Sequence, residues 1–331
     1  MLVGSKTRRG ALGGLATIGG LALLPPAALA QAAPGIQEQT PPPPEPAVVP
    51  SASADPEDAP TQIQVARRLF EHVTAPVYIN GLGPFRFMVD TGANVSCISQ
   101  TLAQKLDLPK GRQVGVHTIV GRKLRSTVLI DELDIGNRKR KRVQAPVLPM
   151  VGFTIDGVLG IDWLKGQRLV FGFSENTLEI TRSRQDTEVK NSVVVPARRK
   201  SGQLTIVDAE LGGKRISAMI DSGSQYSLGN TALRRAIEQQ DPTAREKAIK
   251  VGMVSIAGEN FDGEQLNLPF IRLGGLNLGN VPVVFTDMPV FKLWDLHDTP
   301  TIMLGIDLLT QFTTVAVDFG RSAVRFDIAE A

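Results

Sequence analysis

From about residue 70 onward, the chain consists of short apolar runs rich in Val, Ile, Phe and Thr, separated by Gly and Asn-Gly. Such residues favour strands and such separators favour tight turns, so the pattern predicts an all-β fold. Residues 77–80 and 85–89 flank one predicted hairpin. Helical patterns are few. Residues 99–106 form a short one, and residues 230–249 form a longer one that Asp241-Pro242 interrupts, because proline breaks a helix interior.

The strand pattern occurs twice in the chain. In the first copy an apolar strand leads into Asp90-Thr91-Gly92-Ala93, and in the second an apolar strand leads into Asp221-Ser222-Gly223-Ser224. Downstream, each copy has a Leu-Gly-Ile-Asp sequence, ending at Asp162 and at Asp307, which we interpret as structural residues. A strand pair closes each copy: residues 169–173 with 177–180, and residues 314–319 with 323–328. The recurring order predicts two copies of one structural unit.

Residues 1–30 have the three parts of a secretory signal. Basic residues precede an apolar run at 11–24, and small residues ending at Ala30 offer a cleavage site. The run is shorter than the roughly 20 residues of a membrane span. We therefore expect a cleaved signal, a periplasmic protein and no stable span afterwards. The basic start resembles a twin-arginine export signal, with the general secretory route as one alternative and an uncleaved N-terminal anchor as another.

Residues 31–60 hold nine prolines and five acidic residues but no basic residue. Such a stretch cannot bury an apolar core, so it predicts an extended, disordered linker. The alternative is a pro-segment. The two copies of the repeat then predict an N-terminal lobe at residues 61–184 and a C-terminal lobe at residues 185–331.

The charge balance argues against nucleic acid as a partner. The chain has 36 basic and 33 acidic residues, and the three basic residues of the leader account for the difference. Cys97 is the single cysteine and there are three histidines, so neither a disulfide nor a zinc site is expected. We expect no metal and no cofactor, and we expect Cys97 to be a buried packing residue.

The two Asp-(Thr/Ser)-Gly motifs, each paired with a downstream Leu-Gly-Ile-Asp, resemble those of the retroviral-type (retropepsin-like) aspartyl proteases. The tandem arrangement is similar to that of the bilobed pepsins, and the resemblance covers about residues 70–330. It implies two closed β-barrel lobes of the acid protease fold, with few short helices and with a catalytic pair formed by Asp90 and Asp221. The residues that it implies as support for the pair are Thr91, Gly92, Ala93, Ser222, Gly223 and Ser224.

Two carboxyl groups suit peptide hydrolysis without a metal or a covalent nucleophile. At about 3 Å apart they cannot both ionise, so they share one proton and act as base and acid on a bound water. Ser224 can donate a hydrogen bond to Asp221, whereas Ala93 has no hydroxyl to offer Asp90. We therefore expect the shared proton to reside on Asp90.

A flap hairpin should cover the pair from each copy. The first candidate spans residues 114–129, with its tip at Val120, Gly121 and Arg122. The second spans residues 251–268, with a wider tip that begins at Gly258 and extends to residue 263. Pepsins place a tyrosine in the first flap, and this chain has none there.

The sequence thus predicts a monomeric aspartic endopeptidase that processes exported proteins. Its polypeptide substrate would bind in extended form and pair with the flap strands. Two alternatives stay open. The chain could be a catalytically silent protease fold that binds or scaffolds peptides, or the active enzyme could need two chains that pair lobe to lobe.

Overall fold

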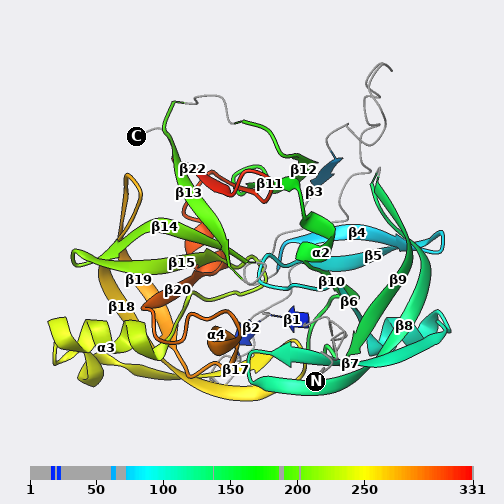
Figure 1. The fold of residues 1–331 in the computed structure, drawn as a ribbon, viewed down its shortest axis with the longest axis horizontal. Helices are drawn as coiled ribbons and strands as arrows, with labels where there is room; N and C mark the ends of the chain where they lie inside the picture. Colours follow the sequence, from blue (N-terminus) through cyan, green and yellow to red (C-terminus); the bar gives the residue numbers. More distant parts are fainter. Residues whose placement is uncertain are drawn as a thin grey trace, which may run out of the picture.

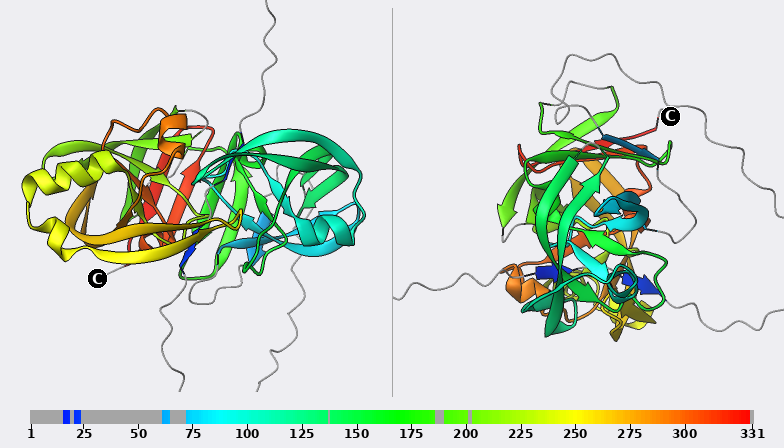
Figure 2. Two further views of the ribbon diagram at one scale, coloured as in Figure 1. Left: turned by 90° about the horizontal axis from the view of Figure 1, so that it is seen from below. Right: turned by 90° about the vertical axis from the view of Figure 1, so that its right-hand side faces the viewer.

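The computed structural model describes residues 72–136, 138–185, 190–200 and 203–329, together with three short strands at residues 16–18, 21–23 and 61–64. The predicted signal peptide and proline-rich linker, residues 1–60, lie outside the described residues except for the first two of these strands. The described ranges form two β-barrels that lie side by side (Figures 1 and 2). Within those ranges, the structure has no helix of the length and hydropathy that crossing a bilayer requires.

The N-terminal barrel is a closed ring of six strands in the order β4-β5-β10-β6-β9-β8. It closes where β8 pairs with β4, through Tyr78 opposite Asp134 and Ile79 opposite Leu133. Its strands are β4 (Thr74–Ile79), β5 (Leu82–Val89), β6 (Cys97–Ser99), β8 (Gly121–Ile135), β9 (Arg138–Leu148) and β10 (Gly157–Leu159). The burial of alternate residues along β4 is what the apolar alternation of its sequence predicts.

The C-terminal barrel repeats this ring in the order β14-β15-β20-β16-β19-β18. It closes where β18 pairs with β14, through Ala209 opposite Leu273 and Glu210 opposite Arg272. Its strands are β14 (Gln203–Leu211), β15 (Lys214–Ile220), β16 (Leu228–Gly229), β18 (Asn260–Leu273), β19 (Leu276–Phe285) and β20 (Thr301–Leu304). The prediction of two closed barrels in tandem is confirmed.

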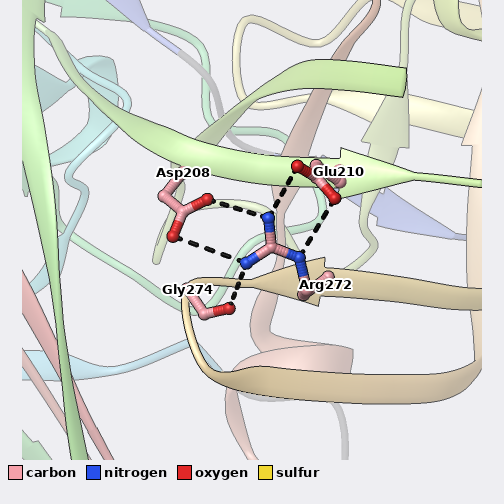
Figure 3. Close-up of polar contacts among 4 residues, drawn as sticks. All are labelled: Asp208, Glu210, Arg272 and Gly274. Carbon is pink, nitrogen blue, oxygen red and sulfur yellow. Dashed lines mark hydrogen bonds and ion pairs between the residues drawn. The ribbon is translucent and has the colours of Figure 1, made fainter. Parts of the chain in front are cut away.

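Arg272 reinforces the short closing edge of this second barrel (Figure 3). Its guanidinium group bonds Glu210 through Nε and Nη2, at 3.1 and 2.7 Å. Nη2 also lies 3.1 Å from Asp208 Oδ1, and Nη1 donates to the carbonyl oxygen of Gly274 at 2.6 Å. A planar guanidinium group offers five N–H donors in a fixed fork, so it can hold two carboxylates and a carbonyl oxygen at once. One side chain therefore ties β18, β14 and the turn after β18 together.

A sheet built by both halves of the chain joins the barrels. The strand pair after each Leu-Gly-Ile-Asp sequence lies at its centre, where β11 pairs with β21. In order, its strands are β3 (Thr61–Gln64), β12 (Thr177–Arg182), β11 (Gln167–Gly172), β21 (Thr314–Asp318), β22 (Ala323–Asp327) and β13 (Ser192–Lys200). Phe171, Phe319 and Phe326 are buried against this sheet. The two lobes therefore share apolar packing as well as backbone pairing.

Helices are few and short, as expected. The short predicted helix is α1 (Gln100–Lys105), which Ser99 caps by accepting from the N–H of Leu102. The longer one is α3 (Thr231–Gln240), which ends before Pro242, and a 3₁₀ turn, η1 (Ala244–Lys247), follows it. The remaining helices are single turns: α2 (Ile161–Leu164), α4 (Val290–Leu293) and α5 (Ile306–Leu309). Cys97 is buried, as predicted, and burial raises the pKa of its thiol.

Candidate active site

The two Asp motifs meet at the centre of the molecule. Asp90 follows β5 and Asp221 follows β15, the equivalent strand of the second barrel. The two loops are anchored in equivalent ways. The N–H of Asp90 donates to the carbonyl oxygen of Leu159, and the N–H of Asp221 donates to the carbonyl oxygen of Leu304, both at 3.0 Å. A Cβ atom on Gly92 would lie only 2.7 Å from the carboxyl carbon of Asp221. Only glycine permits this approach, so one loop lies directly against the other lobe's carboxyl group.

Thr91 and Ser222 brace the two loops against each other. The hydroxyl of Thr91 accepts from the N–H of Ser222 at 3.0 Å and donates to the carbonyl of Ile220 at 2.7 Å. In the reverse direction, the hydroxyl of Ser222 accepts from the N–H of Thr91 at 3.1 Å and donates to the carbonyl of Val89 at 2.8 Å. All four bonds are buried and cross from one lobe to the other, so they fix the relative position of the loops that carry the carboxyl groups.

Backbone N–H groups hold both carboxyl groups in place. Asp90 Oδ1 accepts from Gly92 at 2.7 Å and from Ala93 at 2.9 Å. Asp221 Oδ1 accepts from Gly223 at 3.0 Å. Because one oxygen of each carboxyl group takes the backbone donors, the second oxygen of each is left for the partner carboxyl group and for a bound water.

Burial makes ionisation of this pair costly. Asp90 and Asp221 are 0% and 1% exposed. Burial, and then the negative charge of Asp221, raise the pKa of Asp90 well above its ordinary range, although the N–H groups of Gly92 and Ala93 act in the opposite direction. Burial raises the pKa of Asp221 to about 7. The pair therefore retains a proton at pH values where an exposed aspartate, with a pKa of about 3.9, is ionised.

The hydroxyl of Ser224 does not have the role that we predicted for it. Instead of donating to Asp221, it donates to the carbonyl oxygen of Tyr226 at 2.6 Å. Ser224 supports Asp221 through its backbone N–H, which lowers the pKa of that carboxyl group. We predicted that a serine hydroxyl would stabilise ionised Asp221 while Ala93 offered Asp90 no such donor. That difference loses its physical basis, because Ala93 and Ser224 each support their aspartate through a backbone N–H.

Two further serines, one in each lobe, bond the aspartates of the downstream Leu-Gly-Ile-Asp sequences. Ser96 donates to Asp162 Oδ1 through its hydroxyl at 2.8 Å and its N–H at 2.9 Å. Ser227 donates to Asp307 through the same two groups, its hydroxyl to Oδ1 at 2.8 Å and its N–H to Oδ2 at 3.0 Å. Asp162 and Asp307 thus have the structural role that we expected. The sequence analysis missed both serines, although each follows the motif aspartate by six residues in its copy.

The two flaps are hairpins at equivalent places in the barrels. The first flap is β7 (Lys110–Thr118) and the start of β8, and the second is β17 (Ile249–Ser255) and the start of β18. The first tip is formed by residues 119 and 120, so Val120 lies at the tip while Gly121 and Arg122 begin β8. The second tip spans residues 256–259 and includes Gly258. The prediction that it extends to residue 263 was wrong, because β18 already begins at Asn260.

Each flap tip packs into the other lobe. Ile119, at the first tip, is buried in a cluster with Met219 and Met253 of the second lobe. Ile256, at the second tip, is buried in a cluster with Met88 and Val116 of the first lobe. The sequence analysis missed this exchange, because no local pattern shows which of two equivalent barrels a hairpin tip contacts.

Polar contacts join the tips as well. Glu259 accepts from the hydroxyl of Thr118 at 2.7 Å and lies 2.8 Å from the ammonium group of Lys123, both on the first flap. It also accepts from the hydroxyl of Ser255 at 3.2 Å on its own flap. One carboxylate therefore joins the two flaps. Over the described ranges, no three His, Cys, Asp or Glu side chains are grouped as metal ligands.

The family comparison agrees with this geometry. A family model of the gag-polyprotein aspartyl protease matches residues 75–166, and a family model described as aspartyl protease matches residues 207–308. The chain belongs to the retropepsin-like aspartyl proteases. Each of its two aspartyl protease domains contributes one motif, so Asp90 and Asp221 come from different domains of one chain. No curated protein matches the chain.

Proposed function

We propose that the protein is an aspartic endopeptidase whose catalytic pair, Asp90 and Asp221, forms between the two lobes of a single chain. The observation that carries the proposal is the buried meeting of the two motifs, which the four bonds of Thr91 and Ser222 hold in register. The raised pKa values of both carboxyl groups support it, because the mechanism needs a pair that keeps one proton near neutral pH.

The chemistry follows from that single shared proton. The ionised carboxyl group accepts a proton from a water held between the two side chains, while the protonated one donates to the carbonyl oxygen of the peptide bond. Water then adds to the carbonyl carbon, and the amine leaves with a proton. The substrate would lie extended between the pair and the flaps, where backbone pairing with β7 and β17 can hold it in place.

The test uses the full chain and a library of peptides of mixed sequence, with products identified by mass spectrometry. We expect cleavage at internal bonds and inhibition by a statine-type transition-state analogue. Asp90→Asn and Asp221→Asn should each reduce the rate by about 10²–10⁴-fold. The matched control is Asp298→Asn, because the side chain of Asp298 is 99% exposed. Peptide binding without any cleavage would support the alternative, a silent scaffold.

We also propose that the enzyme acts after export, as a monomer, on exported proteins. The N-terminal sequence supports the location, and the presence of both carboxyl groups in one chain supports the monomer. Cell fractionation and sedimentation of an active sample test the two statements. Activity confined to the cytoplasm, or to a species of twice the mass, would overturn the corresponding one.

A further inference from the structure

A run of five basic residues opens β9. Residues 138–142 read Arg-Lys-Arg-Lys-Arg, and β9 starts at the first of them. Like charges in such a run repel one another unless opposite charges or water offset them. Lys141 and Arg142, at the end of the run, are exposed to water. The first three residues of the run line a cavity as well, so they have surroundings that the last two do not share.

The cavity lies beside the sheet that joins the two lobes, and its volume is about 200 Å³. The helix α2, which connects β10 of the first barrel to β11 of the sheet, contributes Trp163. The first residue of β11 and the last residue of β12, Gln167 and Arg182, lie opposite each other in the sheet and also line it. The lining residues are Arg138, Lys139, Arg140, Trp163, Gln167 and Arg182. None of them belongs to the catalytic pair or the flaps, so this cavity is separate from the site described above.

The cavity has a positive lining. Four of its six lining residues are basic, and within the ranges that the structure describes no acidic side chain lines it. The charge of Lys139 is offset on its far side, since its ammonium group lies 2.7 Å from Glu132 and 3.4 Å from Asp134. The nearby Asp162 uses Oδ1 to accept both bonds from Ser96. A negatively charged ligand would therefore be attracted chiefly by the guanidinium groups.

Arg140 and Trp163 form the centre of this lining. The guanidinium carbon of Arg140 lies over the Trp163 ring, 4.8 Å from its centroid. A guanidinium group that stacks on a ring keeps its N–H groups at its edge, where they can donate to an oxyanion. Trp163 is 6% exposed, and its Nε1 is buried without an acceptor among the described residues. Because a buried indole N–H ordinarily has a partner, this one points to a ligand that accepts hydrogen bonds.

The amide of Gln167 adds a further polar group. Its Oε1 is buried, and no donor reaches it within the described part of the chain. A half-turn about the last side-chain bond replaces this oxygen with the NH₂ group, which donates. The amide, the indole and the guanidinium groups can then all donate to the same ligand.

We propose that this cavity binds a phosphate group in its monoester form, of which inorganic phosphate is the smallest example. Such a group carries nearly two negative charges at neutral pH and has three strong acceptor oxygens, which suits several cationic donors better than a single carboxylate does. The volume is below the roughly 300–1,000 Å³ of cavities that hold drug-sized ligands, so only a compact group fits. The proposal goes beyond the proposed peptidase and does not depend on it.

The test is calorimetric titration of the full chain with inorganic phosphate, with the ionic strength held constant by chloride so that general screening does not change. We expect one phosphate per chain. Arg140→Gln removes the stacked guanidinium, and Trp163→Phe keeps a ring for Arg140 but removes the N–H. Each should weaken binding by at least about tenfold, because each removes a hydrogen bond to a charged group.

The matched control is Arg142→Gln, which removes a charge from the same run outside the cavity and should leave the affinity unchanged. Thermal melting shows whether each variant is folded, and Arg140→Gln, at an exposed side chain, provides the test if Trp163→Phe is not. A chain that does not bind phosphate would overturn the proposal. An equal loss in Arg140→Gln and Arg142→Gln would overturn it as well, because the run would then act as a charged surface.

Vesicles distinguish a lipid headgroup from a soluble phosphate ester. Phosphatidic acid presents a phosphate monoester, whereas phosphatidylserine presents a phosphodiester, so phosphatidylcholine vesicles with either lipid are compared at equal surface charge. A lipid source predicts sedimentation with phosphatidic acid vesicles only, lost in Trp163→Phe and reversed by added phosphate. Binding of phosphate in solution without binding to either vesicle supports a soluble ester. Equal binding to both vesicles that Trp163→Phe leaves unchanged, by a chain that does not bind inorganic phosphate, refutes the cavity as a phosphate site.

Discussion

Thr91 and Ser222 each hold a hydroxyl group at the contact between the lobes, where it both accepts from and donates to the backbone of the opposite lobe. The sequence motif indicates these residues, because both follow a motif aspartate. It could not indicate the partner of Ser224. A hydroxyl rotates freely, and the carbonyl of Tyr226 is the acceptor that it takes.

The methyl group of Thr91 is not needed for the brace, so the hydroxyl can be tested alone. Thr91→Val should lower the free energy of unfolding by about 1–3 kcal/mol, since it leaves buried backbone groups without a partner. The matched control, Thr91→Ser, keeps the hydroxyl and should lose much less. Denaturant titration measures both, and a larger loss for Thr91→Ser than for Thr91→Val would mean that the methyl packing, rather than the brace, holds the loops.

Ser224 provides a second prediction at this scale. Because its hydroxyl donates to Tyr226 rather than to Asp221, Ser224→Ala should leave the acid limb of the pH–rate profile in place. The apparent pKa values belong to the coupled pair, so the whole profile is the observable. A shift of the acid limb, with the fold verified by circular dichroism, would show that the hydroxyl reaches the pair in the working enzyme.

At the scale of elements, the apolar runs correctly predict the strands and the first hairpin, whereas the two barrels and the two flap hairpins were implied by the resemblance to the aspartyl proteases. The second flap tip is shorter than predicted, because β18 already begins at Asn260. Gly263 instead lies within β18, where a Cβ atom would come within 2.7 Å of the side chain of Met253. Close packing, which a single sequence does not display, requires this glycine. The exchange of flap tips between lobes escapes prediction for the same reason.

The flap contact of Glu259 predicts how substrate binding responds to its loss. Glu259→Gln removes the charge that faces Lys123 and weakens the bond from Thr118. We expect KM to rise by up to about tenfold with a smaller change in kcat, because a contact between flaps holds substrate and transition state alike. Glu246→Gln, at an exposed glutamate of η1, is the matched control. An unchanged KM would show that the apolar tips alone hold the flaps closed.

At the scale of the whole molecule, the two domains depend on each other for the site and for the sheet between them. The repeat predicts two equivalent units, but it could not predict that their closing strand pairs meet at β11 and β21. The lobe boundary at residues 184 and 185 stays a prediction.

The buried pair also links the stability of the whole fold to pH. Because the pKa of Asp221 is raised to about 7 and that of Asp90 is also raised, the native state keeps protons that the unfolded chain releases above about pH 4. The free energy of unfolding should therefore fall as pH rises from about 4 to 7, by roughly 1.4 kcal/mol per pH unit for each retained proton. Asp221→Asn should flatten this slope and Asp298→Asn should not. A free energy of unfolding that rises between pH 4 and 7 would contradict the buried shared proton. The same pH slope in the unmodified chain, Asp221→Asn and Asp298→Asn would contradict it as well.

The central claim is that Asp90 and Asp221, from different lobes, work as one catalytic unit. The most direct test compares the cleavage rates of Asp90→Asn, Asp221→Asn and the double variant, with all three shown to be folded. Residues that act as a unit are not additive, so the double variant should be no slower than the slower single variant, and both single variants should lose about 10²–10⁴-fold. A single variant that retains the native rate, or a double variant whose loss is the product of the two single losses, would contradict the account.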